Sequence, residues 1–172
     1  MQELSSLIRS IPDFPRAGVM FRDVSPLLAS ASALARCIDA LAEPWQGRGV
    51  QAVGGIEARG FIFGAALALR LQAGFVPLRK PGKLPPPVES VGYQLEYGSD
   101  RLEIQRDVLK PGERVLLLDD VLATGGTLAA AAKLVAQAGA ALIGAGVVIE
   151  LVALGGRSRW PTDLPLHSLL RY

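Results

Sequence analysis

Residues 115–127 read Val115-Leu116-Leu117-Leu118-Asp119-Asp120-Val121-Leu122-Ala123-Thr124-Gly125-Gly126-Thr127 and determine the predicted fold. The apolar run that opens the segment does not alternate with polar residues, which is typical of a parallel strand buried on both faces. Two adjacent carboxylates follow, then a loop of small residues, then an alanine-rich helix predicted to end at Ala138. A strand, a loop and a helix in this order are the repeating unit of α/β sheets.

The loop after this strand has the composition of a phosphate site. Glycines allow backbone amides to approach a phosphate, hydroxyls add donors, and the next helix begins with the positive end of its dipole; the loop residues concerned are Ala123, Thr124, Gly125, Gly126 and Thr127. Asp119 and Asp120 can accept hydrogen bonds from a vicinal diol. Ligands of open α/β sheets bind at the carboxyl ends of strands, so the segment predicts a ribose 5-phosphate site.

Two other nucleotide motifs do not fit this segment. A Walker A loop requires a lysine that the loop lacks, and the dinucleotide fingerprint G-x-G-x-x-G does not follow the strand. The remaining alternative is a buried strand followed by a solvated acidic turn and a glycine cap. Two carboxylates followed by Thr-Gly-Gly-Thr are a costly way to make a turn, so we favour the phosphate site.

Strand and helix signals alternate along the rest of the chain. Ser30 or Ser32 can cap a helix that stops near Pro44, and residues 4–11 predict a short amphipathic helix ended by Pro12. Other segments predict strands at 51–54, 75–78, 114–118 and 142–151, a helix at 61–71, and an antiparallel hairpin from 93–97 and 102–104. This alternation favours an α/β fold with a central parallel sheet.

Length and composition favour one globular domain of 172 residues, half of them hydrophobic. The net charge of +2 does not indicate a general nucleic-acid or membrane binder. Cys37 and His167 are the only residues of their kinds, which excludes an intrachain disulfide and disfavours cysteine-cluster zinc sites and a Ser-His-Asp triad. The start of the sequence lacks signal-peptide features, and the glycine-rich apolar stretch 138–156 predicts a buried strand rather than a membrane span. We therefore expect a cytoplasmic protein.

The Asp-Asp-x-x-Ala-Thr-Gly-Gly-Thr loop resembles the phosphoribosyl-diphosphate motif of the type I phosphoribosyltransferases. Further segments between about Ile11 and Glu150 are similar to the adenine branch of this family, in its order and spacing: Ile11-Pro12-Asp13-Phe14-Pro15, Gly18-Val19-Met20-Phe21-Arg22-Asp23, Gly55-Ile56-Glu57-Ala58-Arg59-Gly60-Phe61, Arg79-Lys80-Pro81-Gly82-Lys83-Leu84-Pro85 and Leu95-Glu96-Tyr97-Gly98. The resemblance implies the type I fold: a mainly parallel twisted sheet flanked by helices, with an N-terminal hood (1–30) and a flexible lid and hairpin (79–104) in a single domain (1–172).

The resemblance also implies where a diphosphate binds. The implied residues are Glu57, Ala58 and Arg59, with a cis peptide bond between the first two, and the lid cations Arg79, Lys80 and Lys83. A guanidinium can bind a diphosphate bidentately, and a cationic lid would attract this anion and exclude water. Without the resemblance, Arg59 would be a surface residue on a loop and residues 79–83 a solvated basic loop. The run Pro85-Pro86-Pro87 departs from the family and leaves the lid's mobility open.

For the purine, the resemblance implies Glu96 as the general acid/base at N7, beside Tyr97 on the hairpin. Glu103 and Asp107 are nearby alternatives outside the matching motif. The adenine pocket would be formed by Phe21 stacking on the ring, by backbone groups of Met20 and Arg22, and by Leu151. Taken alone, Glu96 would be a solvated hairpin residue and Phe21 an ordinary core aromatic.

The expected activity is transfer of the 5-phosphoribosyl group from 5-phosphoribosyl 1-diphosphate to adenine, giving AMP and diphosphate. The resemblance implies Mg²⁺ carried by the diphosphate without direct protein ligands, catalytic roles for Glu96 and Arg59, and a homodimer. Two alternatives were weighed. A non-catalytic sensor on the same fold normally needs an added nucleic-acid-binding element, for which the first ten residues are too short. A xanthine- or guanine-specific relative is disfavoured by the Phe-Arg-Asp and Leu-Glu-Tyr-Gly segments.

Overall fold

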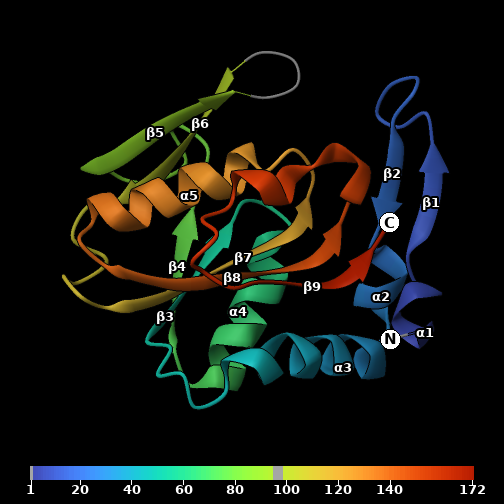
Figure 1. The fold of residues 1–172 in the computed structure, drawn as a ribbon, viewed down its shortest axis with the longest axis horizontal. Coiled ribbons are helices and arrows are strands. Elements are labelled where there is room, and N and C mark those ends of the chain that lie inside the picture. Colours follow the sequence, from blue (N-terminus) through green and yellow to red (C-terminus); the bar gives the residue numbers. More distant parts are fainter. Residues whose placement is uncertain (1, 95–98) are drawn as a thin grey trace.

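The computed structural model describes residues 2–94 and 99–172 and is built on a five-stranded parallel sheet (Figure 1). Its strand order is β4-β3-β7-β8-β9, and every neighbouring pair is parallel. The strands are β3 (Ala52–Ile56), β4 (Gly74–Leu78), β7 (Arg114–Leu122), β8 (Ala141–Glu150) and β9 (Leu166–Arg171). The predicted α/β fold with a central parallel sheet is therefore confirmed.

Helices cover both faces of this sheet. Helices α3 (Ala31–Ala42) and α4 (Gly60–Leu71) lie on one face, and α5 (Gly126–Gln137) lies on the other (Figure 1). Strand β7 shows how the chain specifies this layering, because Leu116 and Leu118 pack with α3 and α4 while Val115 and Leu117 pack with α5. All four side chains are fully buried, as expected for an unalternating apolar strand.

Local signals set the helix ends as predicted. The Ser30 hydroxyl accepts a hydrogen bond from the Ala33 amide and so caps α3, which gives way to a 3-10 turn η1 (Glu43–Trp45) at Pro44. Helix α5 begins directly after Gly125, whose φ of 80° lies in the left-handed region. A glycine adopts this conformation without a Cβ penalty, so the phosphate-type loop and the helix start are one feature.

The N-terminal region corrects one prediction. The helix predicted over residues 4–11 is limited to α1 (Gln2–Ser5), and Arg9–Pro12 instead forms strand β1, paired antiparallel with β2 (Met20–Asp23). Arg9 also forms an ion pair with Asp23 across these strands. Pairing with the nearby strand β2 outweighed the weak helical periodicity, which a short segment cannot sustain by itself. A short helix α2 (Ser25–Ala29) follows β2.

A second hairpin lies over α5. Strands β5 (Val88–Gln94) and β6 (Ser99–Gln105) pair antiparallel, which confirms the predicted hairpin but starts its first strand five residues earlier. The hairpin is joined to the lid segment by mutual backbone hydrogen bonds between Arg79 and Glu103. Two 3-10 turns, η2 (Val152–Leu154) and η3 (Gly156–Arg159), connect β8 to β9. Within residues 2–94 and 99–172, no helix is long and apolar enough to cross a membrane.

Candidate active site

The paired carboxylates lie inside strand β7 rather than after it, because the strand continues to Leu122. Asp119 and Asp120 are 9% and 6% exposed, and the Asp120 amide donates to the Asp119 carboxylate at 2.8 Å. Burial, together with the neighbouring Asp120 carboxylate, raises the pKa of Asp119 well above its ordinary value. Burying two adjacent acids is costly without partners, so this sheet edge is built for hydrogen-bond donors or cations.

Arg59 is the cation that meets these acids. It precedes α4, and its Nε lies 2.6 Å from the Asp120 Oδ2 atom. Burial raises the pKa of Asp120, and the Arg59 charge opposes this rise. Within the described residues, this buried Oδ2 atom has no partner of hydrogen-bond geometry, so the charge of Arg59 alone compensates it and a ligand hydroxyl could still donate to it.

The loop between β7 and α5 encloses a small hollow of about 120 Å³. Its walls bring together most of the loop residues predicted for the 5-phosphate, with Asp119 at one side; the loop residues are Ala123, Thr124, Gly125 and Thr127. Gly126, also predicted, begins α5 immediately beside it. Backbone amides, hydroxyls and a helix N-terminus therefore converge on a space of phosphate size.

A backbone contact from a distant segment shapes this loop. A Cβ at Gly125 would lie 2.3 Å from the Gly156 carbonyl oxygen, and a Cβ at Gly156 would lie 2.1 Å from the Ala123 carbonyl oxygen. Gly156 was not predicted as a site residue, because no local pattern shows that η3 packs on this loop. Arg157 beside it is paired with the buried Glu150 at 2.6 Å, and this ion pair fixes the position of η3.

The diphosphate residues predicted between β3 and α4 form a tight turn. The peptide bond between Glu57 and Ala58 is cis, as the resemblance implied. The Glu57 carboxylate accepts from the Lys80 amide at 2.9 Å and pairs with Arg79 at 3.1 Å. Burial opposes ionisation of Glu57, but these partners lower its pKa overall. The Glu57 side chain thus ties the lid to this turn, which leaves backbone groups for any contact to an anion.

The lid cations have internal partners. Lys80 Nζ lies 2.7 Å from Asp100 on the hairpin, and this hydrogen bond raises the pKa of Lys80. Arg79 stacks over Phe61, with its guanidinium 5.6 Å from the ring centroid, and donates to the Lys83 carbonyl at 3.0 Å. Lys83 itself is exposed. The structure therefore places the three predicted cations on one segment between the turn at Glu57 and the hairpin.

The hairpin tip, including Glu96 and Tyr97, falls outside the described residues, and these two predictions are not tested. The described part of the hairpin contacts the site through Tyr93, whose hydroxyl interacts with Thr127 of the phosphate loop and with Asp100. Glu103, a weighed alternative to Glu96, is only 7% exposed and accepts from the Gly82 amide at 3.2 Å. Through this hydrogen bond, Glu103 holds the lid segment at Gly82 against the hairpin. Sequence reasoning missed both roles, because alternation gives the face of a strand but not its partner.

The residues predicted for adenine lie on β2 and after β8. Phe21 packs edge-on against Phe14 at 5.0 Å, and the Arg59 guanidinium lies 4.9 Å from its ring centroid. Met20 is 47% exposed. Arg22 stacks on Tyr172 at 4.0 Å, which connects the N-terminal hairpin to the last residue of the chain.

Leu151 is partly buried and donates its amide to Leu122 at the end of β7. Arg22 Nε and Tyr172 Oη are buried without hydrogen-bond partners in the described structure. Phe21 thus meets the Arg59 end of the site directly, while Leu151 lies where β7 and β8 end. The same described residues contain no group of three or more His, Cys, Asp or Glu arranged to bind a metal ion.

Comparison with known proteins agrees with this geometry. The family model described as "Phosphoribosyl transferase domain" matches residues 24–162. Adenine phosphoribosyltransferase of Thermosynechococcus vestitus is 54% identical over 170 residues, which cover 99% of each chain. The chain belongs to the adenine phosphoribosyltransferase family. A second member of the family, from Xanthomonas campestris, is also 54% identical, over 98% of this chain and 90% of its own.

Solved structures of the family have the same fold. The adenine phosphoribosyltransferase of Rhodothermus marinus superposes with a TM-score of 0.96 at 47% identity, covering 99% of this chain and 97% of its own. The Saccharomyces cerevisiae enzyme, solved with an imino-altritol bisphosphate and adenine, gives 0.92 at 41% identity over 98% and 97% of the two chains. The type I fold implied by the sequence is thereby confirmed.

Proposed function

We propose that this adenine phosphoribosyltransferase forms AMP and diphosphate from adenine and 5-phosphoribosyl 1-diphosphate with the residues described above. The single observation that carries the assignment is the juxtaposition at the end of β7. Two buried carboxylates, one of them paired with a guanidinium, lie beside a phosphate-sized hollow. A ribose 5-phosphate presents the matching groups: two vicinal hydroxyls that donate and a phosphate that accepts.

In this mechanism the chain positions the sugar and stabilises the leaving group. Asp119 and Asp120 accept the ribose hydroxyls, and residues 123–127 bind the 5-phosphate. Arg59, released in part from Asp120, and the cations Arg79, Lys80 and Lys83 bind the diphosphate, with backbone groups of Glu57 and Ala58 beside them. Charge that develops on the diphosphate as the bond at C1 breaks then meets fixed positive groups.

Mg²⁺ fits this site as an ion bound to the substrate diphosphate rather than to protein side chains. The ion keeps several waters and commonly binds proteins through substrate phosphates, and the nearest buried acids already have the ribose to bind. When bound, it supplies charge neutralisation of the leaving group. The chain's own contribution is the set of cations formed by Arg59 and the lid, which would bind the diphosphate oxygens directly.

The purine half of the site is assigned to the two hairpins. Phe21 stacks on adenine, backbone groups of Met20 and Arg22 hydrogen-bond its edge, and Leu151 covers the opposite face. Glu96 holds the proton at N7 while N9 attacks C1, with Tyr97 beside it on the lid. The contact of Tyr93 with Thr127 supports this assignment, because it anchors the base of the hairpin at the phosphate loop. Residues 1–30 act as the hood and residues 79–104 as the lid of one domain.

A homodimer is part of the proposal. Helix α4, which directly follows Arg59, exposes an apolar stripe that includes Ile62 and Leu69, the latter 82% exposed. A second copy of the chain would cover this stripe and steady the adjoining turn. Light scattering should give a dimer for the wild type and a monomer for Leu69→Glu. Val108→Glu, at an exposed residue away from α4, should stay dimeric. The cytoplasmic location remains a prediction.

One assay tests the activity itself. AMP formation from labelled adenine and 5-phosphoribosyl 1-diphosphate should require Mg²⁺ and persist in the presence of hypoxanthine, guanine or xanthine. Strong competition by any of these three bases would contradict the adenine assignment while leaving the phosphoribosyl site in place.

A further inference from the structure

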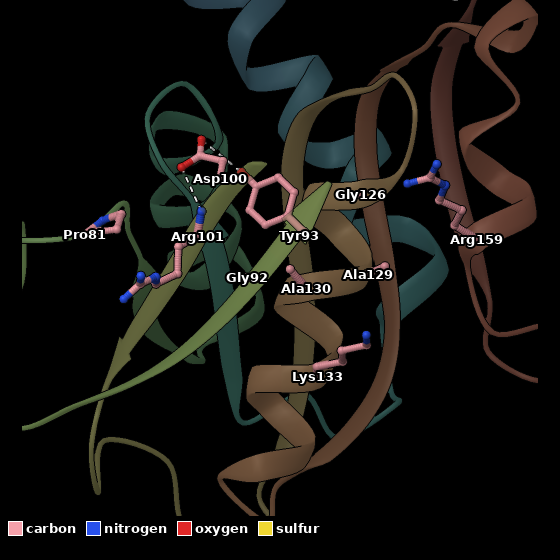
Figure 2. A pocket seen from close by; sticks show the side chains of 10 residues that line it. All are labelled: Pro81, Gly92, Tyr93, Asp100, Arg101, Gly126, Ala129, Ala130, Lys133 and Arg159. Atoms are coloured by element: carbon pink, nitrogen blue, oxygen red, sulfur yellow. Dashed lines mark hydrogen bonds between the residues drawn. The ribbon is translucent and has the colours of Figure 1, made fainter. Parts of the chain in front are cut away.

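A large hollow lies beside the active site on the other side of the hairpin. It has a volume of about 630 Å³ and opens between the hairpin, α5 and η3 (Figure 2). Its walls come from all three elements and include Tyr93, Arg101, Gly126, Ala129, Lys133 and Arg159. Pockets for small molecules commonly measure about 300–1,000 Å³, so this space suits a ligand of nucleotide size.

This hollow borders the phosphate loop at Gly126 but is a different cavity from the 5-phosphate hollow. It shares no lining residue with the 120 Å³ hollow assigned to the 5-phosphate. Tyr93 stands between them, lining the large hollow while its hydroxyl interacts with Thr127 on the other side. The hollow also has Pro81 of the lid in its wall, and none of the substrate groups assigned above is placed in it.

The cations around the hollow have no partner among the residues that the structure describes. Within the described residues, the side chains of Arg101, Lys133 and Arg159 form no hydrogen bond or ion pair, whereas Arg59, Arg79 and Lys80 at the active site all do. Figure 2 shows Lys133 and Arg159 on either side of Ala129, with the Arg159 guanidinium directed toward the start of α5. The sole acid in the lining, Asp100, is already paired with Lys80. The unbalanced positive charge favours an anion.

An apolar hollow continues from this cationic one along α5. It measures about 460 Å³ and shares Ala129, Lys133 and Arg159 with the first. Its other walls are mostly aliphatic, with one carboxylate at the exposed residue Asp163; they are formed by Ala132, Ala136, Ala140, Leu142, Pro161 and Leu164. The two hollows make one groove, cationic toward the hairpin and apolar toward Leu164.

We propose that this groove is a second nucleotide site, distinct from the catalytic one. The phosphates of a nucleoside triphosphate bind Lys133 of α5 and Arg159 of η3. Arg101 of β6 also lines the hollow, and its guanidinium, which Figure 2 shows directed away from Lys133 and Arg159, would turn toward the anion. The base lies on the apolar floor of Ala132, Ala136 and Leu142, and a purine amino group can donate to Asp163. A ligand that bridges α5 and β6 would fix the hairpin that forms the lid.

Calorimetry on the full-length protein tests this proposal. GTP is titrated into protein saturated with AMP, so that the catalytic site is occupied and the base of the probe differs from the substrate. We expect one equivalent of GTP to bind, with an affinity that falls as salt is added. Lys133→Glu and Arg159→Glu should each weaken this binding at least tenfold. Both side chains are exposed, so AMP binding and AMP formation should be unchanged in these variants.

The control is Lys110→Glu, the same charge change at a turn outside the groove, which should bind GTP like the wild type. A parallel titration with tripolyphosphate distinguishes the contribution of the cationic half of the groove from that of the apolar half. Tripolyphosphate should bind more weakly than GTP because it lacks a base. Absence of GTP binding at saturating AMP would overturn the proposal, as would equal loss of affinity in Lys110→Glu. Tripolyphosphate binding as tight as GTP binding would overturn the assignment of the base.

Discussion

At the scale of single residues, the site depends on charges that the fold buries before any substrate binds. Asp119 and Asp120 lie inside a strand, nearly closed to solvent, with one guanidinium to offset them. Burial of unmatched acids costs stability, and such costs are accepted at functional sites. The arrangement is therefore explained by the ligand rather than by the fold.

The first prediction concerns these two acids. Asp119→Asn and Asp120→Asn should each lower kcat/KM for 5-phosphoribosyl 1-diphosphate by about 10²–10³-fold, the usual loss for one preorganised electrostatic partner. Their melting temperatures should be equal to the wild type or higher, because each variant removes a buried charge. Asp39→Asn, which breaks an exposed ion pair with Arg70, is the control and should leave the kinetics unchanged. Wild-type kcat/KM in both site variants would exclude the ribose role.

The second prediction concerns Glu96. Glu96→Gln keeps the shape of the side chain but cannot exchange a proton with N7, so it should lower the single-turnover rate by about 10²–10⁴-fold. Single-turnover measurement is required because product release can hide the chemical step. The control is Glu89→Gln, since Glu89 is a half-buried residue of the same hairpin paired with Arg106. Glu103 does not serve as a control, because it is buried and supports the lid. An unchanged single-turnover rate would show that Glu96 transfers no proton.

At the scale of elements, the phosphate loop is shaped by two glycines from segments thirty residues apart. Gly125 adopts a positive φ, and the Gly156 carbonyl oxygen lies 2.3 Å from the position that a Cβ on Gly125 would take. Because the neighbour is backbone, it cannot swing away as a flexible side chain would. The loop and η3 therefore touch through these two glycines, and a side chain added at either glycine displaces the amides that bind phosphate.

The third prediction follows from this contact. Gly125→Val should abolish AMP binding in calorimetry, because the side chain has neither the dihedral freedom nor the space it needs. Gly112→Ala is the matched control: Gly112 has a similar φ of 76°, but nothing lies within 4 Å of an added Cβ. It should cost about 1 kcal/mol of stability and leave AMP affinity intact. A folded Gly125→Val protein with normal AMP affinity would show that this loop is an ordinary turn and not the phosphate site.

At the scale of the whole molecule, the sequence predicted the sheet better than the packing between distant segments. The apolar runs at 114–118 and 142–151 indicated buried strands, and the carboxylates and glycines between strand and helix indicated the phosphate site. The contact of Gly156 with Gly125 could not be predicted, because it joins loops that no periodicity relates. The same holds for the burial of Glu103 and for strand β1, whose partner, not its own residues, makes it a strand.

The network around Glu150 shows how such distant segments are held. Glu150 ends β8 and is almost fully buried; it pairs with Arg157 of η3 and, at 3.4 Å, with Arg171 of β9. The Ser168 hydroxyl donates to it at 2.6 Å. One carboxylate thus joins the sheet edge to the segment that shapes the phosphate loop. The stability of the fold therefore depends on whether Glu150 is ionised.

The fourth prediction is a pH dependence of stability. Hydrogen bonds from Arg157 are the main cause that lowers the pKa of Glu150 from 4.5 to about 2. The folded state therefore favours the ionised carboxylate, and its contribution is complete above pH 4.5 and lost as the pH falls from about 4.5 to about 2. At about 1.4 kcal/mol per pKa unit, Glu150→Gln should lower the free energy of unfolding by about 3 kcal/mol at pH 7.

Urea unfolding of both proteins at several pH values between 7 and 3 measures this difference. The gap between wild type and Glu150→Gln should be constant down to about pH 5 and then narrow, because the wild type is the protein that loses the ionic contribution. Asp23, whose pKa is also lowered to about 2 chiefly by Ser25, titrates in the same range but is present in both proteins and cancels in the comparison. A gap that stays the same at pH 3 would mean that Glu150 contributes through its shape alone, and that η3 is placed over the phosphate loop by packing rather than by charge.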